Sequence, residues 1–324
     1  MRAIYKNGGY YGLGRVVNGG IIFNQFDRYS GKPKHYLPFQ SDTQFTLNTN
    51  NNAKNWDGIL EYSTNTTTWN EWNGTSISSS SDGLLYLRGT GNTKITGSAN
   101  KEFIFSNASN LKALGNIEYL LDWETVKNGE HPTMSSNCYR SILQGCISLT
   151  IPPELLATTL ANSCYTDMFH DCTSLIIPPK LPATTLTYSC YSAMFTDCTS
   201  LTILPELPAT TLAERCYAGI FRNCRNIKVS ETQNNEYKYE WRIPTTGEIL
   251  GTPSIWNLNM LKSTGGTFTG KPQINTTYYT NNPPIPTTPA PMNMSRVAMF
   301  GIEPNQCNDD ENIKILNKLG VEQI

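Results

Sequence analysis

The sequence predicts an α+β fold in which an N-terminal β-sandwich is followed by a short solenoid of 26-residue rungs and a C-terminal tail. Cysteine pairs spaced C-x7-C recur at a strict period of 26 residues between positions 138 and 224. Such a period is typical of a solenoid, whose copies bury their apolar sides by stacking. Short alternating runs between positions 41 and 105, separated by Asn-, Gly- and Ser-rich turns, favour the sandwich.

Composition limits the classes of function. The chain has 324 residues and a formal net charge of -1, and its Lys and Arg residues are spread without clusters. This charge distribution disfavours nucleic-acid binding. The first residues contain no apolar run of signal-peptide length, and no later stretch approaches a membrane span. We therefore expect a soluble chain, made in a cytoplasm, without membrane insertion.

Residues 1–40 are rich in glycine and aromatic residues and show no period. The phrase GYYGLG is no dinucleotide fingerprint, because it lacks the third glycine and a flanking βαβ pattern. A segment this apolar without its own core is expected to dock on the sandwich or on another subunit. We interpret it as an attachment or assembly segment that contacts further copies of the chain or other proteins of a particle.

Residues 41–110 are predicted to form the β-sandwich. Within them, Trp69 and Trp72 have two possible roles. Aromatic faces stack on pyranose rings, so the pair is a candidate glycan-stacking site. A tryptophan in a strand of a small sandwich also belongs naturally to the core, and this alternative stays open.

Residues 111–280 are predicted to form the solenoid with its capping rungs. In the third copy, apolar residues occupy positions 186, 190, 194 and 198, which predicts a one-sided helical stripe. Alternation over positions 201–207 predicts a short strand that stops at Pro208. A degenerate fifth rung is expected around Met260 and Leu261, 40 residues after Ile220 and Phe221. Stacked rungs would place a parallel sheet on one face and helices on the other.

Residues 281–324 begin with the stretch NNPPIPTTPAP, which predicts a stiff linker. The tail beyond it predicts a short helix that Asp309 or Asp310 caps and Gly320 ends. This helix is either an attachment peptide or a packed terminus.

Eight of the nine cysteines belong to the repeat. Zinc sites favour C-x2-C knuckles, and redox motifs favour C-x-x-C beside a βαβ unit, and the sequence has neither. We expect buried, reduced thiols that act as small apolar groups, one column per position of the rung. Disulfides between facing cysteines and a metal site are the alternatives.

The sequence contains no motif of a known catalytic site, and no catalytic, cofactor-binding or metal-binding residue is predicted. Only three histidines occur. His170 takes the place of Gln144, Thr196 and Arg222 in the other copies, so we expect it at a variable, solvent-facing position. The paired carboxylates of a glycosidase leave no spacing signature, so a glycan-acting enzyme remains an alternative to a non-enzymatic protein.

The repeat separates constant letters from variable ones. The constant letters are expected to form the inward stripe of each rung, and the variable ones to point outward. The outward positions form a candidate recognition surface. Its members are Thr166, Asp167, Lys180, Glu206 and Arg222.

The repeat pattern C-Y-x-x-M-F-x-x-C-T-S-L-x-x-x-P-x-L-P-A-T-T-L resembles the BspA-like type of leucine-rich repeat. The resemblance covers about positions 138 to 230. The first copy departs from it at Ile142 and Leu143, and the last copy has Arg225-Asn226-Ile227 in place of Thr-Ser-Leu, as end rungs often do. The resemblance implies a leucine-rich-repeat scaffold of the kind found in adhesion and interaction proteins, and no cofactor.

Similar repeat and flanking phrases occur in proteins encoded by phages of gut bacteria. The resemblance therefore implies a structural and recognition protein of a bacteriophage particle: a fibre, decoration or adhesin subunit that presents its repeat surface to a host cell or glycan. The expected location is the virion, after synthesis in the host cytoplasm. The alternative is a BspA-like adhesin on a bacterial cell surface.

Overall fold

The computed structural model describes residues 35–96, 102–243, 255–274 and 276–286, and the backbone of five short strands outside these ranges. The chain divides into two compact units, Met1–Lys34 with Pro289–Ile324, and His35–Thr288. In the first unit, β1 (Ile4–Lys6) pairs with β2 (Gly9–Tyr11), and β3 (Arg15–Val17) pairs with β4 (Gly20–Ile22), both antiparallel. The predicted tail helix around 309–320 lies outside the described residues.

The described part of the chain is built mostly of strands in several sheets, which confirms a β-rich fold. Its helical content is one 3-10 helix, η1 (Ile117–Leu120), and one short α-helix, α1 (Trp123–Lys127). The helical half of the predicted α+β class is therefore wrong for the described residues. Among the described residues no helix has the length and apolar character needed to cross a membrane.

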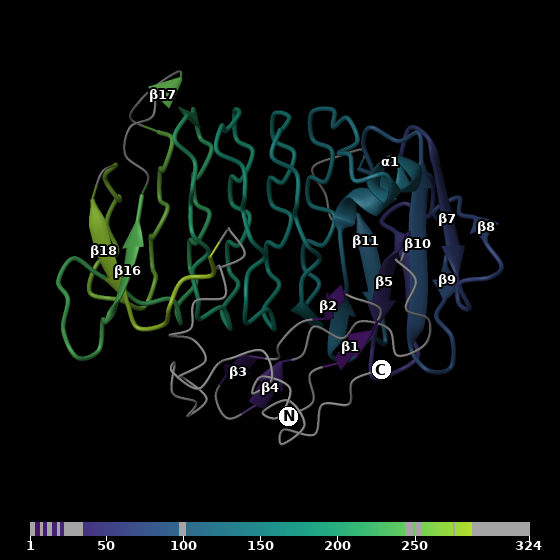
Figure 1. Cartoon of the computed structure of the whole chain (residues 1–324), viewed down its shortest axis with the longest axis horizontal. Helices are drawn as coiled ribbons and strands as arrows, with labels where there is room; N and C mark the ends of the chain where they lie inside the picture. Colours follow the sequence, from purple (N-terminus) through teal and green to yellow (C-terminus); the bar gives the residue numbers. More distant parts are fainter. Residues whose placement is uncertain are drawn as a thin grey trace, which may run out of the picture. The chain divides into compact units, whose positions relative to one another are not determined.

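Two sheets form the N-terminal part of the second unit (Figure 1). The larger sheet has the strand order β13-β12-β5-β10-β7-β8, and the smaller has the order β11-β6-β9. The strands of the larger sheet are β5 (Leu37–Gln40), β7 (Ile59–Ser63), β8 (Asn70–Glu71), β10 (Leu84–Thr90), β12 (Leu111–Ala113) and β13 (Leu149–Ile151). Those of the smaller sheet are β6 (Thr46–Thr49), β9 (Ile77–Ser78) and β11 (Phe103–Ser106).

Residues 35–121, which we call the sheet module, share a core of large aromatic rings. Phe39 and Phe45 both pack against Phe105, and Trp72 packs against Phe103. Strand β5 precedes position 41 yet pairs with β10 and β12, so the sheet module starts earlier than the sequence suggests. Strand β13 belongs to the first repeat copy and pairs with β12, so the module and the repeats share one sheet.

The repeat copies lie side by side as rungs, each joined to the next by backbone hydrogen bonds (Figure 1). We call the stacked segments 138–146, 164–172, 190–198 and 216–224 the turn ladder. Within it, alternate N–H groups have different partners. The N–H of Tyr165 donates to the carbonyl of Cys190 in the next rung (3.0 Å), whereas the N–H of Thr166 donates to Ser163 within its own rung (3.2 Å). Backbone groups are thus paired both along and between the rungs.

The turn ladder replaces the predicted helices because its chain turns every four residues. A residue with positive φ recurs at that spacing, as at Ser189 (53°), Ala193 (52°) and Asp197 (62°). Serine, aspartate, asparagine and glycine dominate these positions, and of these glycine, asparagine and aspartate tolerate the left-handed region best. An α-helix has 3.6 residues per turn, so an apolar stripe at strict fourfold spacing drifts around it. In the turn ladder the same stripe stays on one side.

Identical side chains form columns through the turn ladder. The rings of Tyr139, Tyr165, Tyr191 and Tyr217 stack with centroids 5.6, 5.8 and 5.9 Å apart and planes within 8° of parallel. Phe169, Phe195 and Phe221 form a second column at 5.6 and 5.7 Å. The constant letters of the repeat are these buried columns, as the sequence predicts.

The return segments between successive turn segments form little regular sheet, unlike the predicted strands. The regular strands among these segments are β13 and the two-residue β14 (Leu212–Ala213), and Thr185 and Thr211 form an isolated parallel bridge. Proline explains this difference, because it lacks the N–H that a central strand must donate. The return segments carry Pro152, Pro153, Pro178, Pro179, Pro182, Pro205 and Pro208.

Non-repeat segments close both ends of the turn ladder. At the first end, the N–H groups of Ile95 and Phe103 donate to the carbonyls of Cys138 (2.9 Å) and Ile142 (3.0 Å), so the sheet module supplies the missing preceding rung. At the other end, the N–H of Phe221 donates to the carbonyl of Met260 (3.1 Å). This register confirms the expected alignment of the fifth rung.

Further strands cover the last rungs. β15 (Val229–Ser230), β18 (Thr277–Thr280) and β16 (Tyr239–Arg242) form an antiparallel sheet, and β14 (Leu212–Ala213) pairs with β17 (Ile249–Leu250). Residues 281–286, predicted as the start of a stiff linker, lie along the third rung. There, the N–H of Glu206 donates to the carbonyl of Ile285 (2.9 Å).

Candidate functional site

The variable positions of the turn ladder are less exposed than the sequence suggests. Thr166 is buried, and its hydroxyl donates to the carbonyl of Ser189 in the next rung (2.7 Å), so its assignment to an outward recognition surface is wrong. Thr196 is buried in the same manner and donates to Gly219 (2.8 Å). Small hydroxyl side chains occupy these places because they satisfy carbonyl oxygens beside the rung junctions.

The other four residues of the predicted surface remain accessible. Asp167, Lys180 and Arg222 are half-buried and Glu206 is exposed. They fall into two groups, because Asp167 and Arg222 belong to the turn ladder whereas Lys180 and Glu206 belong to the return segments. The predicted single surface is therefore two strips of the rungs.

The return-segment strip carries alternating charge. Glu154, Lys180 and Glu206 occupy the same position of consecutive copies, 26 residues apart. Glu154 is exposed as a residue, but the protein around its carboxyl group partly desolvates it and so raises its pKa. The positive charge of Lys180 opposes that shift. Opposite charges on adjacent rungs thus neutralise one another along this strip.

The two tryptophans proposed for glycan stacking have different positions. Trp72 is 1% exposed, stacks on Trp56 at 5.0 Å and donates its indole N–H to the carbonyl of Thr75, so it is a core residue and the stacking role is wrong for it. Trp69 is half-buried. The guanidinium of Arg88 lies 4.1 Å from the centre of the Trp69 ring and so occupies one face of the indole. The same guanidinium donates a hydrogen bond to the carboxylate of Glu61 (2.7 Å).

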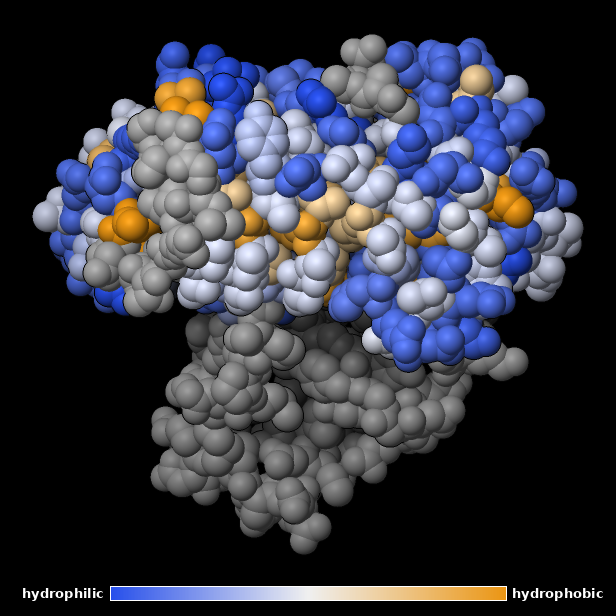
Figure 2. All heavy atoms as spheres, turned by 90° about the horizontal axis from the view of Figure 1, so that it is seen from above, coloured by the Kyte–Doolittle hydropathy of each residue, from blue (hydrophilic) through white to orange (hydrophobic). Residues whose placement is uncertain are grey.

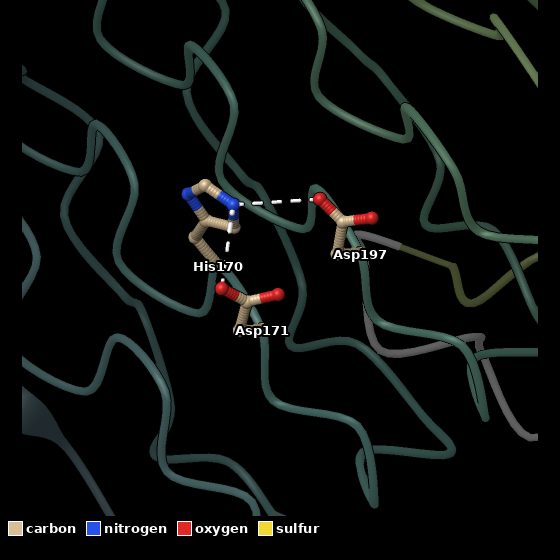
Figure 3. A group of neighbouring side chains, drawn as sticks. All are labelled: His170, Asp171 and Asp197. Carbon is tan, nitrogen blue, oxygen red and sulfur yellow. Dashed lines mark ion pairs between the residues drawn. The ribbon is translucent and has the colours of Figure 1, made fainter.

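The most concentrated set of chemically active side chains lies on the turn ladder, where His170, Asp171 and Asp197 converge (Figure 3). Nε2 of His170 faces Oδ2 of Asp171 at 3.7 Å and Oδ2 of Asp197 at 3.5 Å. One oxygen or nitrogen from each of the three residues lies within 4.8 Å of the others. Asp171 and His170 come from the second rung and Asp197 from the third, so the cluster spans a rung junction.

A second set of polar groups holds this cluster in place. Nδ1 of His170 lies 3.4 Å from Oδ1 of Asp167 and 3.5 Å from the amide nitrogen of Gln144. Oδ1 of Asp197 accepts a hydrogen bond from the side-chain amide of Asn223 (2.8 Å). Asp171, Asp197 and Asn223 occupy one column of adjacent rungs and share a positive φ, as does Asp167.

The electrostatics of the cluster favour positive charge. The carboxylate of Asp167, followed by the charges of Asp171 and Asp197, raises the pKa of His170 above its ordinary value, against burial, which lowers it. The side chain of His170 is 21% exposed, whereas that of Asp171 is 54% exposed. His170 is therefore partly shielded from solvent and lies beside the more exposed carboxylate of Asp171, whereas the sequence suggests a solvent-facing position.

The cysteines form the other chemically notable set. All eight repeat cysteines are buried with free thiols. Burial raises the pKa of Cys216 to about 12 and raises the pKa of Cys164 and Cys224. The sulfur of Cys198 lies 3.0 Å from the carbonyl oxygen of Phe169 in the preceding rung, and that of Cys224 lies 2.9 Å from Phe195. Neutral thiols with hydrogen-bond partners are packing groups and weak nucleophiles.

The spacing of the residues, not their types alone, could have revealed the histidine cluster from the sequence. Asp171 and Asp197 are 26 residues apart, so the period places them in one column of adjacent rungs, and His170 is next to the first of them. The motif is not contiguous, and no metal-ligand spacing is visible in it. Reading down a column of the repeat, instead of along the chain, finds it.

Comparisons with family models, with curated proteins and with solved structures find no match for this chain.

Proposed function

We infer that the chain is a structural and recognition protein of a bacteriophage particle, and that its repeats are a leucine-rich-repeat solenoid of the BspA-like kind. Residues 35–121 serve as a β-sandwich cap in this assignment. The protein presents the outer strips of its rungs to a host cell or glycan, and residues 1–40 attach it to other particle proteins or to further copies of itself.

The observation that supports this proposal best is the division between the columns of the rungs. Buried columns repeat the same side chain in register, whereas the accessible positions differ from copy to copy. At the position of Asp171, which is accessible in every copy, the copies carry Gly145, Asp171, Asp197 and Asn223. A stack with a constant interior tolerates changes on its outer strips, which suits a recognition surface.

The surface of the repeat unit fits such a role. Seen from above, it has polar borders on either side of a narrow apolar band (Figure 2). Exposed apolar side chains of the repeats include Ile147 (65%), Tyr188 (44%) and Leu156 (42%). Apolar contact area inside a polar rim is the usual composition of a protein-binding surface.

The closure of both ends supports a scaffold that works as an extended piece of a larger assembly. End rungs with unpaired backbone edges would stack on other chains. Here both end rungs are covered, the first by the sheet module and the last by strands β15, β16 and β18. Assembly is then left to segments outside the stack. Residues 1–34 and 289–324 form the separate compact unit, consistent with the attachment role that we assign to residues 1–40.

Fractionation tests the location. Phage particles purified on a density gradient are digested and searched for peptides of this chain, and the envelope fraction of uninfected bacteria carrying the gene is searched in parallel. We expect the peptides to follow the particles. Peptides confined to the bacterial envelope would instead support the BspA-like adhesin.

Two variants test the division of labour. Deletion of residues 1–34 is expected to leave the stack folded and to abolish incorporation into particles. Simultaneous change of Asp167, Lys180, Glu206 and Arg222 to alanine is expected to leave incorporation intact and to weaken binding of the labelled protein to host cells. A matched control changes Lys54 and Asp82, two exposed charged residues of the sheet module. Normal cell binding by the fourfold variant would refute the recognition surface.

A further inference from the structure

The geometry around His170 matches the coordination shell of a metal ion better than it matches a set of hydrogen bonds. The distances from its Nε2 to Asp171 and Asp197, 3.7 and 3.5 Å, exceed the usual N–H···O separation of about 2.9 Å. Two ligands at about 2.1 Å from one tetrahedral ion lie about 3.4 Å apart. Since Asp171 is 54% exposed, rotation of its side chain can complete the shell without moving the rungs.

The supporting contacts orient the three side chains as metal ligands. When its proton is on Nδ1, beside the carboxylate of Asp167 (3.4 Å), His170 directs the lone pair of Nε2 toward the two aspartates. A metal cation placed between Nε2 and the two carboxylates would accept that lone pair and balance both negative charges. The hydrogen bond from Asn223 likewise fixes one oxygen of Asp197 and leaves the other directed at the histidine.

The stacking of the rungs does not require these residue types. In the column of His170 the other copies have Gln144, Thr196 and Arg222, and in the column of Asp171 the first copy has Gly145 and the fourth has Asn223. Each of those residues occupies its place in a rung with the same backbone pairing. The combination of one histidine and two aspartates occurs at the junction of the second and third rungs alone among the described residues.

We propose that His170, Asp171 and Asp197 form a binding site for a divalent transition-metal ion of the zinc class, which bridges two adjacent rungs. One nitrogen and two carboxylate oxygens suit zinc, manganese or cobalt, whereas calcium takes six to eight oxygen ligands and is disfavoured by an imidazole. Three protein ligands leave at least one coordination position, and the exposure of Asp171 directs that position to solvent. A water molecule or a ligand from a binding partner fills it.

Titration calorimetry on the full-length, untagged chain tests the site, because a polyhistidine tag would itself bind zinc. After chelator treatment, zinc chloride is expected to bind at one site per chain and to raise the melting temperature, whereas calcium chloride is expected to do neither. His170→Gln, Asp171→Asn and Asp197→Asn introduce residues with a natural counterpart in the repeat or a near-isosteric amide. Each is expected to weaken zinc binding by more than about tenfold while the metal-free melting temperature stays close to that of the parent.

Two controls separate this site from other sources of binding. His131→Gln changes a histidine that contacts Glu118 at 2.9 Å, away from the cluster, and is expected to leave zinc binding unchanged. Cobalt titration followed by absorbance separates nitrogen and oxygen ligands from thiolates, because thiolate coordination adds an intense charge-transfer band. Zinc binding that is unaltered in all three ligand variants, a thiolate band in the cobalt spectrum, or no zinc binding by the parent chain would overturn the proposal.

Discussion

In the sheet module the aromatic rings pack against one another at varied angles, whereas in the turn ladder the rings of the tyrosine and phenylalanine columns lie nearly parallel to the same ring of the next rung. The planes of Trp72 and Phe103 meet at 61°, and those of Trp56 and Trp72 at 29°. The planes of Phe195 and Phe221 lie within 2° of parallel. One hydrophobic core nevertheless runs through both regions without a break.

The difference shows two ways in which a sequence specifies its packing. In the sheet module the specific fit of side chains that meet at unlike angles selects one arrangement. In the turn ladder the backbone register selects it, since a column of equal side chains stacks in one way once the rungs are aligned.

The largest effect is expected in thiol chemistry, because the described cysteines all lie in the turn ladder. With burial and raised pKa values, the eight repeat thiols should react slowly with a labelling reagent in the native protein and completely after unfolding. Mass spectrometry of the labelled chain over time measures this. Fast labelling of several repeat cysteines in the folded protein would contradict packing by columns.

Removal of a ring tests the two kinds of core directly. Phe195→Ala, in the middle of its column, and Phe103→Ala, in the sheet module, should each lower the free energy of unfolding by about 3–5 kcal/mol, because both rings are fully buried. Denaturant titration measures the losses.

The matched control on the turn ladder is Asp197→Ala, which removes a side chain that is 34% exposed and should cost little in metal-free buffer. Equal, small losses for Phe195→Ala and Asp197→Ala would show that the column does not carry the stability of the ladder.

Acid should weaken the junction between α1 and the sheet module before it weakens the turn ladder. Burial alone would raise the pKa of Asp122, but the backbone N–H groups of Thr125 and Gly91 bond to its carboxylate, and the net pKa lies below its ordinary value. A depressed pKa adds stability that is present above the unfolded value, near pH 4, and is lost as the pH falls through the folded value.

Asp122→Ala should therefore cost about 1 kcal/mol at pH 7, the usual value of a helix cap, and progressively less below pH 4. Unfolding titrations at pH 7 and pH 3 measure the difference. A cost for Asp122→Ala that does not change between these pH values would mean that hydrogen bonds to the charged carboxylate are not the cause.

The smallest expected effect is the change in stability caused by Ala193→Gly, whose sign distinguishes a turn from a helix. Ala193 has a φ of 52°, and Gly219 occupies the same position of the next rung. Ala193→Gly relieves left-handed strain but adds freedom to the unfolded chain, so stability should rise by about 0.5 kcal/mol or stay unchanged. In a helix the same change costs about 1 kcal/mol. A loss of that size in thermal unfolding would contradict the turn ladder.

The period, the register of the fifth rung and the inward columns could be predicted from the sequence, because each depends on which residues recur. Residues 26 apart must be equivalent in a stack of 26-residue copies. Met260 lies 40 residues after Ile220, so it occupies the equivalent position of the next rung after an insertion in the copy. The β-rich character of residues 41–105 was also visible, since alternation over a few residues is a local property of the chain.

The tertiary structure decided what depends on neighbouring rungs. An apolar residue at every fourth position fits a helix or a run of turns almost equally well, and the backbone hydrogen bonds to the next rung select the turns. The burial of Thr166 and the covering of Trp69 by Arg88 likewise depend on groups distant in the sequence. The convergence of His170 with Asp197 arises in the same way, because stacking turns a separation of 27 residues into a contact of 3.5 Å.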